Sequence, residues 1–349
     1  MSHFRRYAFF DTPEEFEEFF ELATLFCPVD KIQYWRGEGC PGLARDSSDR
    51  KNCGRKMALS PIDQLLFTFI QARAVPHNNT CCDLFDISEG TGTCYFTTWI
   101  RLLEELLLHI CPVDKELHAT LAAGIPAPFS ELFGSREVLQ ILDCLHWDVD
   151  AASDEYARKV LFNAYWGGCV GKALIPLSCL GGYLPCSPVY PGKITDPQIV
   201  EAWLETVFGP KPETVGKFSA AEFAEQGVLF ANTYGLADKG WVDSIRPLLE
   251  RGFMFITPDK KRTGSDQFTE DDSVWNADVA HLRIHVERAI KHIREWRILN
   301  TRMPLLRKDL MSSILMVINL LQNFRPPVGG TDFGFPAGVC AHDLMWGDR

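Results

Sequence analysis

The sequence predicts an all-α N-terminal part followed by an α/β domain. Apolar residues recur at helical spacing in segments 12–26, 59–75 and 91–110, which is typical of amphipathic helices. From residue 136 onward, short apolar runs typical of strands alternate with helical patterns. Some of these runs contain a single carboxylate, which is costly to bury unless it is protonated, paired or bound to a metal. The second part is therefore expected to carry the functional site.

Composition limits the class of protein. The chain has 349 residues, of which 46% are hydrophobic and 12% aromatic, so we expect a large core in two or three folding units. The N-terminal segment lacks the apolar run and small-residue cleavage site of a secretory signal. No apolar stretch reaches the roughly 18 residues that a membrane span needs. The sequence therefore predicts no membrane association.

Charge and cysteine content narrow the setting. The net charge of −11 opposes nucleic-acid binding, because phosphate neutralisation needs clustered Lys and Arg. Basic residues nevertheless concentrate in segments 45–56 and 283–307, so a basic strip on an acidic protein is expected. The 12 cysteines are scattered without C-x-x-C pairs. They are interpreted as mostly reduced, buried thiols of a reducing compartment, with a structural zinc site as the alternative.

The N-terminal part divides into two predicted segments. Residues 1–56 contain a helix that begins at Thr12 and Pro13, followed by a linker rich in Gly, Pro, Cys and charge. Residues 57–112 contain a helix capped by Ser60, a short helix around 82–85, a turn and a long helix. This order is that of a helix-turn-helix domain, whose last helix would offer its N-terminal residues to a DNA groove. A plain three-helix bundle fits the same pattern.

The second half is organised around strands. A linker at 113–134 precedes an α/β domain at 135–326 and a C-terminal tail at 327–349. Strands are expected at 136–149, 161–168, 172–185 and 252–258, with a further strand that ends near Asp238. Helices are expected at 196–208, 281–299 and 312–324.

Four carboxylates stand in apolar or Gly-rich surroundings of this domain: Asp143, Asp196, Asp238 and Glu287. An RNase H-like nuclease core has such an arrangement, with one carboxylate on the central strand, one after a later strand and one on a helix beside the mixed sheet. Converging carboxylates hold two hard divalent cations, Mg²⁺ or Mn²⁺, which promote in-line phosphodiester displacement. Two simpler interpretations remain. Glu287 could belong to a solvated i,i+4 ladder with Arg283 and Lys291, and Asp196 could cap its helix.

Several blocks resemble a known family. LSPIDQLLFTFIQARAV through ISEGTGTCYFTTWIRLLEELL resembles the helix-turn-helix segment that precedes DDE superfamily endonuclease domains of eukaryotic transposons. ILDC, YPGKITDPQIV, LADKGW and AHLRIHVERAI with WRIL resemble the catalytic blocks of PIF/Harbinger-like and Kolobok-like transposases. The resemblance covers about residues 57–325.

The resemblance implies a metal-dependent DNA endonuclease or transposase. Its catalytic residues would be Asp143, Asp238 and Glu287, with Asp196 as a further metal ligand. DNA is the implied substrate and the nucleus the implied location, with the cytoplasm as the alternative. A homodimer and a separate DNA-binding partner protein are compatible with it. The residues expected to contact DNA are Arg50, Lys51, Arg55, Lys56, Lys239, Arg283, Arg288, Lys291 and Arg294.

The sequence also departs from the family pattern. Leu145 and His146 follow Cys144 where a Thr-Glu pair is usual, and basic residues expected near Cys94 and Thr98 are absent. These departures favour an alternative function, that of a domesticated relative that binds DNA or protein with little or no cleavage. His146 and His285 lie close in sequence to the proposed acids and are interpreted as packing residues or as groups that tune the site.

Overall fold

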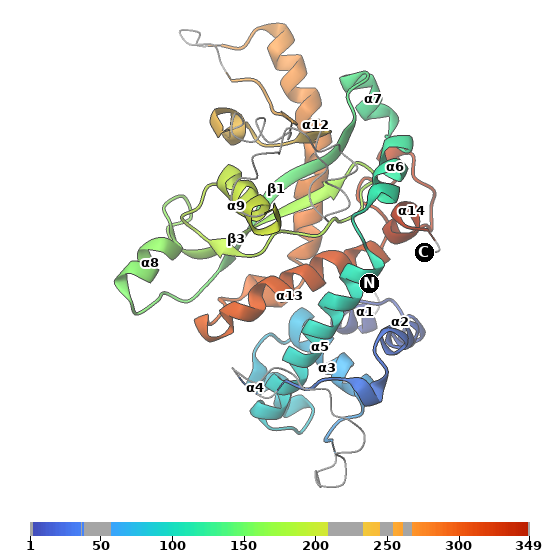
Figure 1. The fold of residues 1–349 in the computed structure, drawn as a ribbon, viewed down its shortest axis with the longest axis vertical. Coiled ribbons are helices and arrows are strands. Elements are labelled where there is room, and N and C mark those ends of the chain that lie inside the picture. The colour runs from blue at the N-terminus through green and yellow to red at the C-terminus, as the bar shows by residue number, and fades with distance from the viewer. Residues whose placement is uncertain are drawn as a thin grey trace. The chain divides into compact units, whose positions relative to one another are not determined.

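The computed structural model describes residues 3–35, 37, 57–208, 233–244, 254–260 and 267–347. The chain forms two compact units that are described separately (Figure 1). Unit 1 comprises residues 1–109 and 294–317, and unit 2 comprises 110–293 and 318–349. Each unit thus joins segments far apart in sequence, whereas the expected domain boundaries are consecutive blocks; those boundaries stay predictions.

The regular elements of unit 1 are all helices within its described residues. Thr12 and Ser60 cap two of its helices by accepting the backbone N–H groups of Glu15 and Asp63, as their sequence positions predict. The elements are α1 (His3–Ala8), α2 (Pro13–Phe26), η1 (Val29–Lys31), α3 (Pro61–Arg73), α4 (Asn78–Leu84), α5 (Glu89–Ile110, whose last residue falls in unit 2), η5 (Arg297–Asn300) and η6 (Leu305–Arg307).

The helices α3, α4 and α5 follow the predicted order of helix, short helix and long helix. The N-terminal half of α5 is mostly buried, however, with Tyr95, Phe96 and Trp99 in the core. The extended segment that contains Trp35 also lies against α5, because the Trp35 N–H donates to Thr98 Oγ1 at 3.0 Å. Own-chain contacts therefore cover part of the surface that a groove-reading helix would need.

Unit 2 is built on a mixed sheet with helices on both faces. Its first elements are α6 (Lys115–Ala123), α7 (Ala127–Phe133), β1 (Val138–Asp148), α8 (Glu155–Leu161), β2 (Phe162–Asn163), β3 (Gly168–Ser178), β4 (Tyr190–Pro191) and α9 (Asp196–Phe208). The remainder are β5 (Tyr234–Leu236), η4 (Lys239–Ser244), β6 (Met254–Ile256), α12 (Glu270–Ile293), α13 (Lys308–Leu321, which begins in unit 1), η7 (Gln322–Phe324), η8 (Gly330–Phe333) and α14 (Ala341–Met345).

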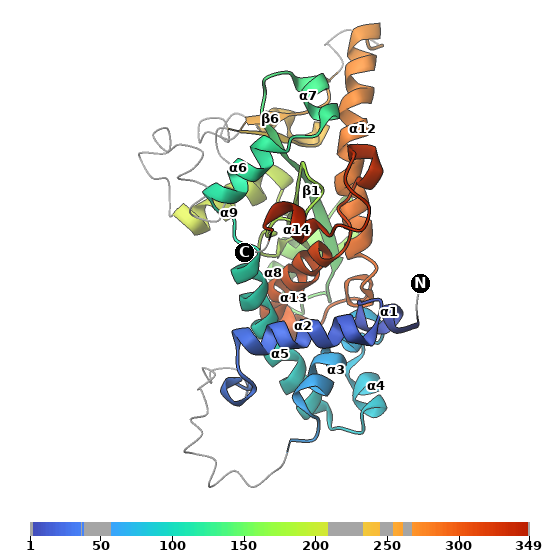
Figure 2. The same ribbon diagram turned by 90° about the vertical axis from the view of Figure 1, so that its right-hand side faces the viewer.

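The strand order among the described residues is β2-β3-β1-β5-β6, and β4 pairs with the edge of β3. β1 is antiparallel to β3 and parallel to β5, and β5 is parallel to β6. β1 is therefore central, and its residues from Val138 to Trp147 are buried except for Asp143 and His146, which are partly exposed. α9 and α12 lie on opposite faces of the sheet (Figures 1 and 2).

Three segments differ from the sequence expectations. Segment 161–168 was expected to be a strand, but only Phe162, Asn163 and Gly168 of it pair, and helix α8 precedes them because Asp154 caps it at Ala157 N. The linker 113–134 contains α6 and α7. The tail 327–349 is packed at its end, where Met345 and Trp346 are buried. The aromatic residues of 161–168 favour a strand. The side chain of Asp154 instead caps a helix that begins at Glu155, just before this segment.

Helix α12 is also longer at its N-terminal end than the predicted helix at 281–299. It begins at Glu270 and ends at Ile293, where the chain turns into unit 1. Its buried stripe contains Leu282, Val286 and Ala289, as the spacing of three and four predicts. No helix among the described residues is both long enough and apolar enough to cross a membrane.

Candidate active site

Asp143 occupies the middle of the central strand. Its side chain is largely buried, and its Oδ1 accepts the Cys144 backbone N–H at 2.8 Å. Burial raises the pKa of Asp143 from 3.8 to about 6, and the nearby carboxylates of Asp196 and Asp238 push the same pKa upward. The Cys144 N–H and the Arg283 guanidinium oppose this rise. Asp143 is therefore a buried carboxyl whose negative charge is incompletely compensated.

Asp238 follows the strand that runs parallel to β1. Because Ile141 pairs with Leu236, continuing this register by two residues sets Asp143 beside Asp238 on the same face of the sheet. The Asp238 side chain is 53% exposed, and its Oδ1 lies 3.3 Å from Arg283 Nη1 on α12. Parallel neighbours and the facing helix thus bring Asp143, Asp238 and Arg283 together.

Asp196 is the first residue of α9, on the side of β3. It pairs with Lys172 Nζ, which also donates to the Ile194 carbonyl at 3.1 Å. Lys172 is only 5% exposed, although it stands in an otherwise apolar strand. No backbone N–H of the described residues donates to the Asp196 carboxylate, so its partner is a cation rather than its own helix end.

Glu287 lies on α12 one turn after Arg283. Residues four apart share a helix face and are separated by about 6 Å along the axis, so Glu287 is on the side of α12 that carries the Asp238 partner. Its side chain is exposed and pairs with neither Arg283 nor Lys291. The i,i+4 ladder is therefore not formed, since Arg283 bonds to Asp238 instead.

The carboxylates of Asp196 and Asp238 are near that of Asp143 without forming a closed metal cage. In the part of the chain that is described, no three His, Cys, Asp or Glu side chains are grouped closely enough to hold a metal ion. Two of the four acids are instead paired with Lys172 and Arg283.

Comparison with protein families decides the assignment of this arrangement. The family model described as DDE superfamily endonuclease matches residues 142–323, more than half of the 349 residues. The chain belongs to the DDE superfamily endonucleases. No curated protein and no solved structure matches it. The matched region begins one residue before Asp143 and includes all four acids.

Membership of the DDE superfamily endonucleases indicates a metal-dependent nuclease or transposase that acts on DNA. The mixed sheet of unit 2, with helices on both faces, is consistent with the core of such a nuclease. The family includes domesticated members, so membership alone does not establish that this chain cleaves DNA.

The residues expected to contact DNA have different partners and lie in both units. Lys239 lies over the Phe268 ring at 5.0 Å, and Arg288 pairs with Asp332 at 3.0 Å. Lys291 is exposed on α12, whereas Arg294 belongs to unit 1. The other expected contacts, Arg50, Lys51, Arg55 and Lys56, lie outside the described residues.

The two histidines near the acids differ. His285 is 1% exposed, its ring lies 4.1 Å from that of Phe333, and burial lowers its pKa to about 4. It is a neutral packing group. His146 contacts the Trp166 ring at 4.9 Å on the strand that carries Asp143. The ten cysteines among the described residues are free thiols, several of them fully buried.

Sequence reasoning missed Lys172 as the partner of Asp196. The signal was present, because a lysine flanked by apolar residues in a predicted strand must find an anion or lose its charge. Its partner, 24 residues further along, is set by the pairing of β3 with the loop before α9. Only the tertiary structure supplies that contact.

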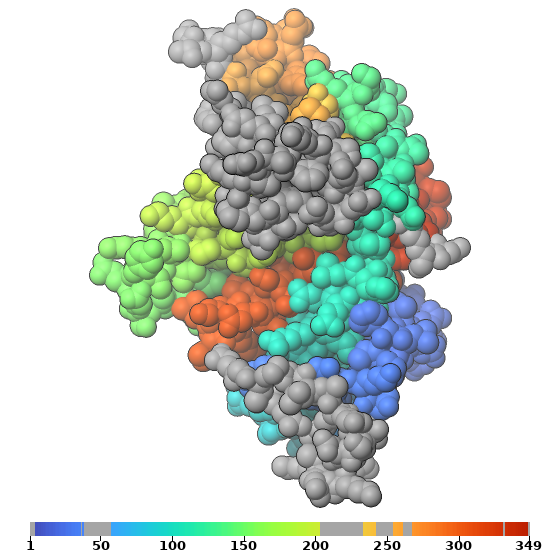
Figure 3. Space-filling model, in the orientation of Figure 1, coloured from blue at the N-terminus to red at the C-terminus, as the bar shows by residue number. Residues whose placement is uncertain are grey.

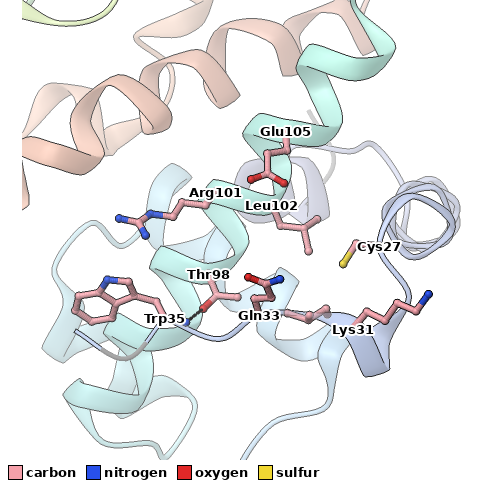
Figure 4. Close-up of a pocket in the computed structure, with 9 residues that line it drawn as sticks. Cys27, Lys31, Gln33, Trp35, Thr98, Arg101, Leu102 and Glu105 are labelled. Atoms are coloured by element: carbon pink, nitrogen blue, oxygen red, sulfur yellow. Dashed lines mark hydrogen bonds between the residues drawn. The ribbon is translucent and has the colours of Figure 1, made fainter. Parts of the chain in front are cut away.

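A pocket of about 350 Å³ lies within unit 1, away from these acids in sequence (Figure 4). It is bounded by α5 on one side and by the segment after α2 on the other. Lys31 and Arg101 bring cations to it and Glu105 a carboxylate. Its lining residues are Cys27, Lys31, Ile32, Gln33, Trp35, Thr98, Arg101, Leu102 and Glu105.

Proposed function

We propose that this chain is a divalent-metal-dependent DNA endonuclease of the transposase type, with Asp143, Asp238 and Glu287 as catalytic carboxylates and Asp196 at the margin. The observation that supports it most is the proximity of Asp143, on β1, to Asp238, which follows the parallel neighbour β5 and is bonded by Arg283 of α12. The order and spacing of the blocks support an RNase H-like core of the PIF/Harbinger-like or Kolobok-like type. Strand transfer by a freed 3′ hydroxyl would extend the same chemistry.

The chemistry of the acids, rather than a closed cage, suits Mg²⁺ or Mn²⁺. The raised pKa of Asp143 reports a buried carboxylate whose charge would be stabilised by an added cation, and hard divalent ions prefer carboxylate oxygen. When bound, such ions activate water and stabilise the charge on the attacking and leaving oxygens. Asp143, Asp238 and Glu287 would hold them.

Before metal binds, hydrogen bonds and ion pairs within the chain stabilise the negative charge of the acids. Because Oδ1 of Asp143 accepts the Cys144 N–H, the proton of the neutral carboxyl belongs on Oδ2. Arg283 holds Asp238 toward α12, and Lys172 holds Asp196 toward β3. These pairs limit the repulsion among the acids and keep them oriented.

Nicking of supercoiled plasmid in Mg²⁺ or Mn²⁺ tests the proposal. Asp143→Asn, Asp238→Asn and Glu287→Gln should each reduce nicking by at least about a hundredfold, because each removes a ligand's charge with little change of shape. Asp148→Asn and Asp278→Asn are matched controls, since both acids are exposed, one on β1 and one on α12. If Glu287→Gln nicks as fast as the controls, Glu287 is not a catalytic residue.

A second candidate is a domesticated relative that binds DNA or protein and does not cleave. It is favoured by the internal pairing of Asp196 and Asp238 with cations of the chain. On this function the parent protein and all three carboxylate variants nick equally poorly, and Mn²⁺ titration detects no site. Detectable parent nicking that Asp143→Asn abolishes excludes it.

DNA binding is proposed to rest on phosphate contacts rather than on base reading by α5. The basic candidates are Arg45, Arg50, Lys51, Arg55 and Lys56, together with the basic side chains of segment 283–297. We expect nearly sequence-independent affinity that falls steeply with salt. A thousandfold preference for one sequence at physiological salt would contradict this. If binding is sequence-independent, a partner protein would choose the target site. We propose that the chain acts as a homodimer in the nucleus.

A further inference from the structure

Unit 2 exposes a group of large aromatic side chains at α8 and the β2–β3 turn. Tyr156, Phe162, Tyr165 and Trp166 are 77%, 45%, 92% and 51% exposed and fall within eleven residues of sequence. We call them the aromatic surface. Figures 1 and 3 show this segment projecting from the edge of the sheet. Burying such side chains is strongly favourable, so their joint exposure indicates a binding surface.

The turn that carries two of these rings has a fixed conformation. Asn163 Oδ1 accepts the backbone N–H groups of Tyr165 and Trp166 at 3.0 and 3.2 Å, and Asn163 Nδ2 donates to the Gly192 carbonyl at 2.8 Å. Gly167 completes the turn with φ 67°, a conformation that favours glycine. The Trp166 ring also contacts His146. The backbone that carries Tyr165 and Trp166 is therefore held in one conformation, which lowers the entropic cost of binding a ligand there.

The charge beside the aromatic surface is mainly acidic. Residues 146–169 contain four acids and two bases, and the exposed Lys193, whose backbone N–H donates to the Val160 carbonyl, adds a third base. The first two bases are already engaged: Arg158 Nε donates to the Ala152 carbonyl at 3.0 Å, and Lys159 pairs with Glu155 at 2.7 Å. Within the described residues no lysine or arginine pairs with Asp148 or Asp150, which are both exposed.

The acids lie close to the rings through the sheet. Asp148 pairs with Val170 of β3, and the adjoining Cys169 pairs with Phe162 of β2. Two adjacent strand spacings, about 10 Å in all, thus separate the Asp148 backbone from that of Phe162. One extended peptide can reach both the carboxylates and the rings.

We propose that the aromatic surface, with Asp148 and Asp150, docks a Lys- or Arg-rich segment of a partner protein. A cation over an aromatic face gains from the ring's negative electron density, and the adjacent carboxylates add attraction. A DNA backbone would meet repulsion from the same acids, and an uncharged apolar partner would leave them unpaired. This role does not depend on the proposed nuclease activity.

Fluorescence anisotropy with a fluorescein-labelled (Arg-Gly)₆ peptide tests the proposal on the full chain. We expect saturable binding that the double variant Tyr165→Ala/Trp166→Ala weakens about tenfold, as loss of two cation–π contacts predicts. Asp148→Asn/Asp150→Asn should weaken binding and reduce its salt dependence. Val274→Ala and Asp278→Asn, at exposed positions of α12, should leave the affinity unchanged. A (Glu-Gly)₆ peptide should not bind.

Three results would overturn it. Peptide binding that survives the aromatic double variant places the basic-peptide site elsewhere. Binding of a dT₁₂ oligonucleotide that the same variant abolishes, without peptide binding, assigns the surface to unpaired nucleic-acid bases. Self-association of the chain that the variant abolishes, without peptide binding, assigns it to a second copy. Circular dichroism of each variant separates loss of binding from loss of folding.

Discussion

Two arginines of this chain are buried to a similar extent but are held very differently. Arg73 in unit 1 is 4% exposed and Arg283 in unit 2 is 8% exposed. Arg73 donates to the Arg5 carbonyl at 2.9 Å and to Glu295 at 3.2 Å, and its guanidinium lies over two rings, those of Phe9 and Trp296. Among the described residues Arg283 has one such contact, at 3.3 Å to an exposed carboxylate, and each guanidinium keeps one buried nitrogen without a hydrogen-bond partner, Nη1 in Arg73 and Nε in Arg283.

The difference separates a structural cation from one that can change partners. A guanidinium fixed by two acceptors and two rings organises the packing around it. A guanidinium with a single exposed partner can release that partner at little cost. Arg283 lies beside the acids of the proposed site, where an added metal or a phosphate would compete for the same charges.

The largest expected effect is the difference in stability between the two arginine-to-lysine variants. Arg73→Lys keeps the charge but loses the fork and the ring stacking, so we expect unit 1 to lose about 3 kcal/mol. Arg283→Lys should cost less than about 1 kcal/mol, because an ammonium can still reach an exposed carboxylate. Hydrogen exchange of the α3 backbone reports the first, and that of α12 the second. Equal loss of protection in both variants would refute the distinction.

Asp143→Asn tests how far Arg283 offsets the negative charge of Asp143. A carboxyl with a raised folded-state pKa contributes stability that is fully present below its unfolded value of 3.8 and is lost as pH rises through about 6. Asparagine mimics the neutral form and does not titrate. In EDTA, the stability of Asp143→Asn relative to the parent should therefore rise by on the order of 2 kcal/mol from pH 4 to pH 8.

Urea unfolding at several pH values measures this difference, with Asp148→Asn as control. Asp148 is at the exposed end of the same strand, so its replacement should give a difference that is nearly independent of pH. A flat profile for Asp143→Asn would mean that Arg283 already neutralises the carboxyl.

Local signals in the sequence predicted much of the fold. Thr12 and Ser60 marked helix starts because their side chains satisfy free backbone N–H groups there, and the apolar spacing of 282–293 marked the buried face of α12. The strand that carries Asp143 was predicted because a long apolar run surrounds the acid. The strand expected at 161–168 formed only in part, because Tyr165 and Trp166, whose aromatic side chains suit a strand, lie in a turn.

The partners within the site could not be predicted in the same way. Arg283 was placed on the correct helix, but its bond to Asp238, 45 residues away, depends on the packing of α12 against the sheet. The i,i+4 pairing with Glu287 was equally consistent with the sequence. The choice between them is made by the proximity of Asp238 at the end of β5, a non-local contact.

The smallest expected effect concerns metal affinity. Arg283→Met keeps most of the buried stem and removes the cation that competes for Asp238, so Mn²⁺ should bind about two- to fivefold more tightly, as an exposed ion pair predicts. Electron paramagnetic resonance of free Mn²⁺ measures this without any cleavage assay. Arg288→Met is the control, because its partner Asp332 is not among the proposed ligands. Weaker Mn²⁺ binding by Arg283→Met would instead show that Arg283 holds Asp238 in the geometry that the metal requires.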